Sequence, residues 1–291
     1  MTTSLPKWLK FPITYSSNIQ KRSKTAFECH KIVFIRHGQS EWNLKNQFCG
    51  WFDAHLSDQG RAEAKQAGKR LKDLKIKLHH GFTSKLCRSI QTLDIILKQL
   101  REKDLPVEQH WRLNERHYGN LTGMNKAEAM ELFGKEKVHI WRRSYKTRPP
   151  KILDVNPHYC DIQTGERYGL KDSEVPECES LADTVARTLP YWLENIVPEI
   201  KKGKTVIVAA HGNSLRGIVK HIEGITDEGI QHLNLPTGVP FVYTLGADMM
   251  ALKDDNAVEF YGNDEQVEAV MKDLRKAKSP DEKKTGAVGD C

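Results

Sequence analysis

Two histidines, each followed by a glycine, stand at the ends of two short apolar runs of this chain. His37 follows residues 31–36 (KIVFIR), and His211 follows residues 205–210 (TVIVAA). A short apolar run that ends at a glycine predicts a buried strand. In open α/β sheets, ligands bind beyond the carboxyl ends of the strands, beside the N-termini of the next helices. Two imidazoles delivered there, one of them preceded by Arg36, predict an anion pocket that contains a candidate nucleophile.

These residue types suit the transfer of a phosphoryl group. The Arg36 guanidinium can hold phosphate with two hydrogen bonds, and a helix N-terminus favours a bound anion. Glycines after both histidines let backbone amides approach a ligand closely. Histidine is a nucleophile only as neutral imidazole, and we expect nearby arginines to lower the pKa of His37 and keep a ring nitrogen free. His211 can donate to phosphoryl oxygens as their charge grows.

The alternative is that both histidines only cap helices or lie in loops. One strand followed by His-Gly favours that interpretation. Two such units with Arg36 before the first favour a site, because titratable groups seldom converge on strand ends by chance.

The composition is that of a globular protein with a substantial core. The chain has 291 residues, 38% hydrophobic and 29% charged, and no apolar stretch long enough to span a bilayer. Its net charge of +7 comes without a basic stripe interleaved with aromatic residues, so we expect a small anionic substrate and no nucleic acid. The six cysteines form no CxxC pair, which argues against a zinc site or a disulfide framework and favours a reducing compartment.

Periodicity predicts strands and helices that alternate, as in an α/β fold. After the strand at 31–36 and a loop over 39–57, we expect helices at 57–74, 86–101, 124–133, 181–196, 215–222 and from about 263, and further strands at 80–83, 106–109, 205–210 and 241–245. Residues 145–178 contain four prolines and predict a long irregular insertion. Pro190 is expected to kink or shorten the helix that Ser180 begins.

The region around the first histidine resembles a known family. Residues 36–43 (RHGQSEWN) match the RHG signature of the histidine phosphatase superfamily and, more narrowly, the 2,3-bisphosphoglycerate-dependent phosphoglycerate mutases. Five further blocks follow in the family's order: Phe48–Asp53, Leu113–Gly119, Trp141–Arg143, Ala210–Ser214 and Leu235–Pro240. The similarity extends from about residue 31 to the end of the last helix.

The resemblance implies a single three-layer domain, with a mostly parallel central sheet flanked by helices. It implies an isomerase of glycolysis and gluconeogenesis that interconverts 3-phosphoglycerate and 2-phosphoglycerate through a phosphohistidine on His37. The intermediate, 2,3-bisphosphoglycerate, would also be the primer, and no metal would be needed. Partners would be phosphoglycerates and one or three further copies of the chain, with no nucleic acid and no membrane.

The resemblance also assigns residues to roles. Glu115 would be the general acid and base, and we expect it to stay ionised in so cationic a site. The catalytic set would be His37, Glu115, His211, Arg36 and Arg88. The substrate-binding set would be Asn43, Cys49, Gly50, Arg116, Tyr118, Lys126, Arg142, Arg143, Gly212 and Asn213.

Several of these residues also have a plainer interpretation. Glu115 can pair with its neighbour Arg116 on a surface loop, and Arg142 and Arg143 can form a solvated helix face. Cys49 stands where the family also has Ser or Thr. If its backbone amide makes the contact, the thiol matters little.

The function has alternatives as well. The same scaffold supports bisphosphoglycerate synthesis or phosphatase action; Ser40 favours the mutase, because the synthase-like branch tends to carry glycine there. A binding protein without turnover is disfavoured, because His37 and Glu115 are both present.

The chain divides into three parts. Residues 1–29 predict a disordered basic extension, with a transit peptide as the alternative, so a cytoplasmic location is expected and organelle targeting stays open. Residues 30–262 would be the catalytic domain, and residues 263–291 a helix and a charged tail. We expect the tail, from about Lys272, to close over the site and exclude water.

Overall fold

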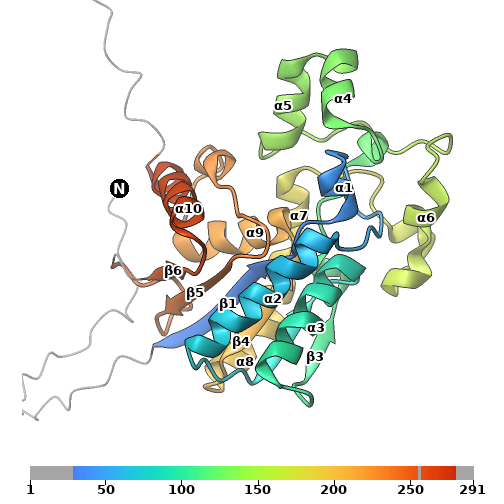
Figure 1. The fold of residues 1–291 in the computed structure, drawn as a ribbon. Helices are drawn as coiled ribbons and strands as arrows, with labels where there is room; N and C mark the ends of the chain where they lie inside the picture. The colour runs from blue at the N-terminus through green and yellow to red at the C-terminus, as the bar shows by residue number, and fades with distance from the viewer. Residues whose placement is uncertain (1–28, 255–256, 280–291) are drawn as a thin grey trace, which may run out of the picture.

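A six-stranded mixed sheet lies at the centre of the structure, a computed structural model that describes residues 29–254 and 257–279 (Figure 1). The strand order is β3-β2-β4-β1-β5-β6. Strands β1 to β4 pair in parallel, whereas β5 pairs antiparallel with both β1 and β6. The strands are β1 (His30–Arg36), β2 (His80–Thr83), β3 (Val107–Gln109), β4 (Val206–Ala210), β5 (Pro240–Leu245) and β6 (Val258–Phe260). The predicted α/β class is confirmed, whereas β6 was not expected from the sequence.

The two strands that precede His37 and His211 are direct neighbours. In the parallel pairing of β1 with β4, Arg36 lies opposite Ala210, and the His37 amide donates to the Ala210 carbonyl at 2.9 Å. Parallel strands end at the same edge of a sheet. His37 and His211 therefore leave the sheet side by side.

Helices cover both faces of the sheet (Figure 1). On one face α2 (Asp58–Asp73) and α3 (Cys87–Leu100) pack against Val33 and Ile35 of β1. Ile32 and Phe34 alternate with them and point into the larger core on the other face. That face is covered by α7 (Leu181–Tyr191), α8 (Val197–Lys201), α9 (Gly212–Glu223) and α10 (Asp264–Lys278). Both faces of β1 are thus buried, as its continuous apolar run predicts.

Pro190 lies inside α7 and is followed by a π-helical turn at Trp192–Ile196 that leads into α8. Proline removes a donor from the α-helical ladder, and a π turn is one way to absorb that loss. The α-helical ladder thus ends at Tyr191, next to Pro190, as expected, but helical turns continue through the π turn and α8 to Lys201.

A smaller helical lobe lies beyond the carboxyl ends of the strands (Figure 1). It consists of α4 (Lys126–Phe133) and α5 (Lys135–Arg143), which share a small core with Phe48 and Leu121. The predicted loop at 39–57 contains a short helix, α1 (Glu41–Leu44), which was not expected. The insertion at 145–178 is mostly irregular, as predicted, with α6 (Tyr159–Gln163) and 3-10 turns at Gly165–Tyr168 and Asp172–Glu174.

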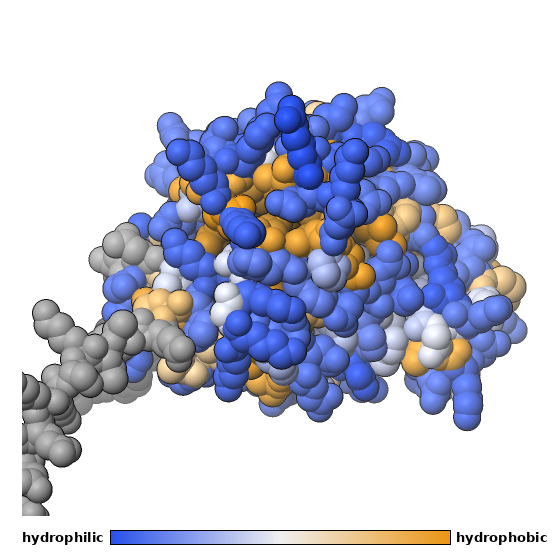
Figure 2. Space-filling model, turned by 90° about the horizontal axis from the view of Figure 1, so that it is seen from below, coloured by the Kyte–Doolittle hydropathy of each residue, from blue (hydrophilic) through white to orange (hydrophobic). Residues whose placement is uncertain are grey.

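The two ends of the chain lie largely outside the described residues, namely 1–28 and 280–291. The predicted extension therefore stays a prediction. The predicted start of the tail at Lys272 is wrong, because residues 272–278 are the last turns of α10, where Leu274 and Ala277 are buried. Within residues 29–254 and 257–279, no helix is both long and apolar enough to cross a membrane. The surface seen from below Figure 1 is largely hydrophilic, with apolar residues in between (Figure 2).

Candidate active site

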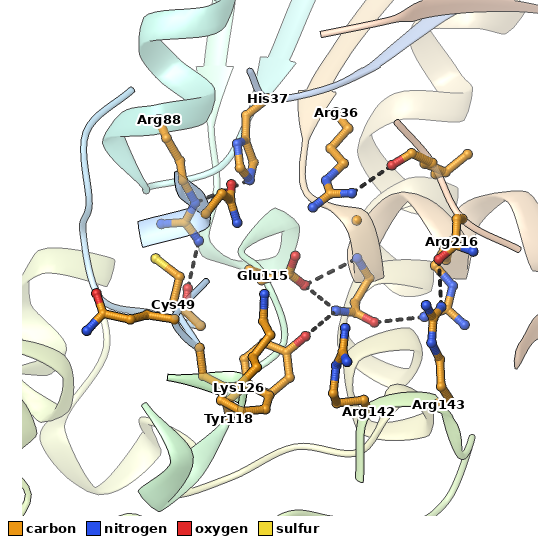
Figure 3. Close-up of a pocket in the computed structure, with 18 residues that line it drawn as sticks. Arg36, His37, Cys49, Arg88, Glu115, Tyr118, Lys126, Arg142, Arg143 and Arg216 are labelled. Atoms are coloured by element: carbon orange, nitrogen blue, oxygen red, sulfur yellow. Dashed lines mark hydrogen bonds between the residues drawn. The ribbon is translucent and has the colours of Figure 1, made fainter. Parts of the chain in front are cut away.

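A small polar cavity of about 140 Å³ lies where β1 and β4 end (Figure 3). Its walls come from the turn after β1, from α1 and the loop behind it, and from α3, α4, α5 and α9. All predicted site residues line this cavity except His211 and Arg116, each of which lies directly behind a lining residue. Segments far apart in sequence therefore converge on one site.

The ring of His37 is held with one nitrogen free for chemistry. Its Nδ1 lies 2.7 Å from the Gly38 carbonyl oxygen, which can only accept, so Nδ1 carries the proton. Nε2 then has a lone pair, and Arg88 Nε donates to it at 3.3 Å. Burial lowers the pKa of His37 well below its ordinary 6.5, and the charges of Arg88 and Arg36 lower it further. At neutral pH His37 is thus a neutral imidazole with a lone pair on Nε2, which is the state that a nucleophilic histidine requires.

Two guanidinium groups beside His37 are fixed by backbone carbonyls and not by carboxylates. Arg88 donates to the carbonyls of Phe52 at 2.9 Å and Gly50 at 2.7 Å. Arg36 donates to the Leu235 carbonyl at 2.7 Å, while its buried Nε has no partner among the described residues. A neutral carbonyl orients a guanidinium without cancelling its charge. The arrangement therefore favours a bound anion such as a phosphoryl group.

His211 supports the site from behind His37. The two ring centroids are 4.9 Å apart, and His211 Nε2 lies 2.7 Å from Ser84 Oγ. Burial, followed by the charge of Arg88, holds the pKa of His211 well below 6.5. Its Nδ1 is buried and has no partner in the described part of the chain. The expected donation to phosphoryl oxygens stays a prediction.

Glu115 is buried, which excludes the surface pair with Arg116. Its Oε1 accepts three hydrogen bonds: from the Arg116 amide at 2.7 Å, the Asn213 amide at 3.2 Å and the Asn213 side-chain amide at 2.7 Å. Its other oxygen, Oε2, lies beside Gly212 at the N-terminus of α9. One oxygen is thus held while the carboxylate faces the cavity, as a proton carrier requires (Figure 3).

The side of the cavity away from His37 is also cationic (Figure 3). Lys126, Arg142 and Arg143 line it, and burial lowers the pKa values of Lys126 and Arg143. Arg116 is fully buried, lies 4.7 Å from the Tyr118 ring centre and acts on the cavity through that ring. Its positive charge lowers the pKa of Tyr118, although burial alone would raise it.

Residues 32–164 match the sequence model of the histidine phosphatase superfamily, branch 1. The match covers less than half of the 291 residues, and it shows what this segment is similar to. The matched segment includes His37, Arg88 and Glu115 of the cavity.

Several solved structures share the fold of this chain. A mycobacterial glucosyl-3-phosphoglycerate phosphatase complexed with VO3 is 21% identical, with 73% of this chain and 92% of that chain covered and a TM-score of 0.56. A putative alpha-ribazole-5'-P phosphatase from Escherichia coli is 16% identical, with 76% and 93% covered and a TM-score of 0.56. At these identities the likeness shows the fold.

Five residues that line the cavity were not predicted from the sequence: Gln47, Phe48, Arg216, Asn234 and Leu235. Phe48 and Leu235 lie inside the motif blocks, so the blocks were a signal for them. Arg216 lies three residues after Asn213 on α9, and residues at that spacing share a helix face. Asn234 has no comparable signal.

Histidine burial predicts a loss of stability in acid. His117 Nδ1 accepts from the Gly119 amide, and burial lowers the pKa of His117 to about 3. Because this value lies below the ordinary 6.5, the unfolded chain takes up a proton at this residue before the folded protein does. The contribution of neutral His117 to stability is therefore fully present above about pH 6.5 and is lost as the pH falls towards 3. For this residue alone, the free energy of unfolding should fall by about 2 kcal/mol between pH 7 and pH 5.

Urea unfolding at both pH values measures this change. In His117→Gln, whose side-chain oxygen can still accept from the Gly119 amide, the difference between the two pH values should shrink by about that amount. An undiminished difference would show that His117 does not titrate as described.

Cys49 is expected to be replaceable by serine. Its thiol donates to the Phe52 carbonyl at 3.4 Å, and burial raises its pKa, so it is neutral at pH 7. Cys49→Ser should keep kcat/KM within about threefold, because a hydroxyl can make the same weak bond. Steady-state kinetics measure this, and a loss beyond tenfold would show that the sulfur itself is needed.

Proposed function

We propose that this protein is a phosphoglycerate mutase that uses 2,3-bisphosphoglycerate as intermediate and primer. The observation that carries the proposal is the two-ended cavity. Arg36, His37 and Arg88 form a phosphoryl end, the cationic residues around Lys126 form an end for other anionic groups, and Glu115 lies between them. A bisphosphorylated glycerate carries anionic groups along its length and needs both ends.

The proposed cycle begins with a phosphoryl group on His37 Nε2. The 2-hydroxyl of 3-phosphoglycerate attacks that phosphorus, the N–P bond breaks, and Glu115 takes the hydroxyl proton. The resulting 2,3-bisphosphoglycerate turns in the cavity until its 3-phosphoryl group faces His37. Nε2 then attacks this phosphorus, and Glu115 returns the proton to the departing 3-oxygen. The products are 2-phosphoglycerate and the phosphorylated enzyme.

The size of the cavity supports a small substrate. Its volume of about 140 Å³ is below the roughly 300–1,000 Å³ of typical pockets for drug-sized ligands. A three-carbon phosphoglycerate suits such a cavity better than a sugar conjugate. The cationic lining supplies charge at several points, and we propose that the reaction proceeds without a metal.

Hydrolysis is the second candidate, and the solved structures favour it. Their names describe phosphatases, at identities between 16% and 21%. In a phosphatase, water attacks the phosphorus of phospho-His37 and inorganic phosphate leaves. The same histidine and the same two arginines serve both reactions, so the attacking group decides between them.

One assay separates the candidates. Conversion of 3-phosphoglycerate is followed through enolase coupling and, in parallel, by release of inorganic phosphate. Chelator treatment of the mutase precedes addition of the Mg²⁺ that enolase needs. A mutase gives enolase signal that rises when 2,3-bisphosphoglycerate is added, with little free phosphate. Phosphate release without enolase signal would overturn the proposal in favour of a phosphatase; accumulated bisphosphate would indicate a synthase.

A further inference from the structure

Arg216 is a buried cation on the wall of the cavity. It lies on α9, is 5% exposed, and lines the cavity beside Arg143 (Figure 3). Its Nη1 donates to Asn213 Oδ1 at 3.0 Å and its Nη2 to the Ile230 carbonyl at 2.6 Å. Both partners are uncharged, and its buried Nε has no partner among the described residues. Arg216 is therefore oriented without being neutralised.

The surroundings of Arg216 are rich in positive charge. Burial, followed by the charges of Arg116 and Arg143, lowers its pKa to about 9. Glu115 and Tyr118 oppose that shift, but Glu115 is the only carboxylate among the residues that line the described cavity. Buried cations in excess of anions are costly, and a bound anion relieves that cost. The cluster is arranged to accept negative charge from a ligand.

Arg216 is also linked to Glu115, the proposed proton carrier, through Asn213. Asn213 accepts from Arg216 through Oδ1, which directs its Nδ2 towards Glu115 Oε1 at 2.7 Å and the Tyr118 hydroxyl at 3.3 Å. Since an amide has one oxygen and one nitrogen, holding the oxygen fixes where the nitrogen points. A ligand anion at Arg216 therefore lies next to the group that orients Glu115.

We infer that Arg216 determines specificity, by selecting phosphorylated ligands that carry a second anionic group away from the phosphoryl end. The carboxylate of a phosphorylated hydroxy acid fits this description, with its charge beside Arg216 and Arg143. The inference rests on the proposed function only in one respect, namely that a phosphorylated ligand binds in the same cavity. It applies equally to a mutase and to a phosphatase.

The test compares two ligands that differ in one group. Ethyl phosphate is 2-phosphoglycolate with a methyl group in place of the carboxylate, and calorimetric titration measures the affinity of each. The full-length wild type should bind 2-phosphoglycolate more tightly. Arg216→Gln should reduce the affinity for 2-phosphoglycolate by about 10- to 100-fold, which is the range expected for the loss of a hydrogen bond to a charged group. Its affinity for ethyl phosphate should fall by less than about threefold.

Two further variants complete the design. Arg216→Lys keeps the charge and should recover part of the lost affinity for 2-phosphoglycolate. Arg148→Gln removes an equal charge from an exposed ion pair with Asp183 and should leave both affinities unchanged. Thermal unfolding in the absence of ligand verifies that each variant is folded.

The outcomes are distinct. An equal loss of affinity for both ligands in Arg216→Gln would overturn the inference and leave Arg216 a purely structural residue. A wild type that binds both ligands equally would overturn it as well. Because the readout is binding, an absence of mutase turnover would refute the proposed function and leave this inference standing.

Discussion

Replacement of His37 by alanine is expected to reduce phosphoryl transfer by about 10⁴-fold or more, because the reaction loses its nucleophile. His37 Nε2 is the lone-pair nitrogen on the cavity side, and its Nδ1 proton is engaged by Gly38. His37 is the only histidine among the described residues that line the cavity. Steady-state kinetics with 3-phosphoglycerate and 2,3-bisphosphoglycerate measure the loss.

A matched control is available for this variant. His139 is an exposed histidine on α5, and His139→Ala should leave turnover unchanged. The His37→Ala protein should also keep its far-ultraviolet circular dichroism. A folded variant that retains more than about a tenth of the wild-type rate would rule out His37 as the phosphoryl carrier.

Replacement of Glu115 by glutamine should have the next largest effect. The glutamine oxygen can still accept from the Arg116 and Asn213 amides, so the local structure is expected to persist. The variant cannot carry a proton between the two substrate hydroxyls. Loss of general acid–base catalysis of this kind reduces turnover by about 10²- to 10⁴-fold.

The choice of substrate makes this prediction specific. The leaving group of p-nitrophenyl phosphate needs little protonation, so Glu115→Gln should reduce its cleavage far less than turnover of 3-phosphoglycerate. Glu128→Gln, at an exposed position of α4, serves as the control. Equal losses with both substrates would show that Glu115 holds the site together and does not carry the proton.

The strands that build the site were predictable from the sequence because their signals are local. Residues 31–36 and 205–210 are continuous apolar runs, and such runs indicate strands buried on both faces. The position of each histidine follows from where its run ends. The pairing of these two strands as neighbours was not predictable from pattern alone, because register is a property of the assembled sheet.

The depth of each side chain in the site was less predictable. Arg116 and Arg216 are both arginines in motif blocks or next to them, yet Arg116 lies behind Tyr118 whereas Arg216 lines the cavity. Sequence spacing gives the face of a helix, but not the distance from that face to a ligand. The cause of the shifted pKa of His37 was likewise only partly expected, because burial exceeds the two arginines as its source.

The charged tail illustrates a further limit. Its charge pattern does not distinguish a helix end from an extended segment, and residues 272–278 complete α10, with Asp273 accepting from Asn234. Asn234 in turn accepts from Arg143 of the cavity. A deletion that tests closure over the site must therefore begin after α10, and residues 280–291 are the segment to remove.

Detection of a phosphorylated His37 tests the account most directly. The protein is mixed with ³²P-labelled 2,3-bisphosphoglycerate, quenched in alkali and digested for peptide analysis. The experiment is then repeated with a chase of unlabelled 3-phosphoglycerate before the quench. We expect alkali-stable, acid-labile label on the peptide that contains His37, and no label in His37→Ala. In the chase, the label should pass to 2,3-bisphosphoglycerate and from there to 2-phosphoglycerate. An unlabelled protein, or label that passes only to inorganic phosphate, would contradict a mutase that works through phosphohistidine.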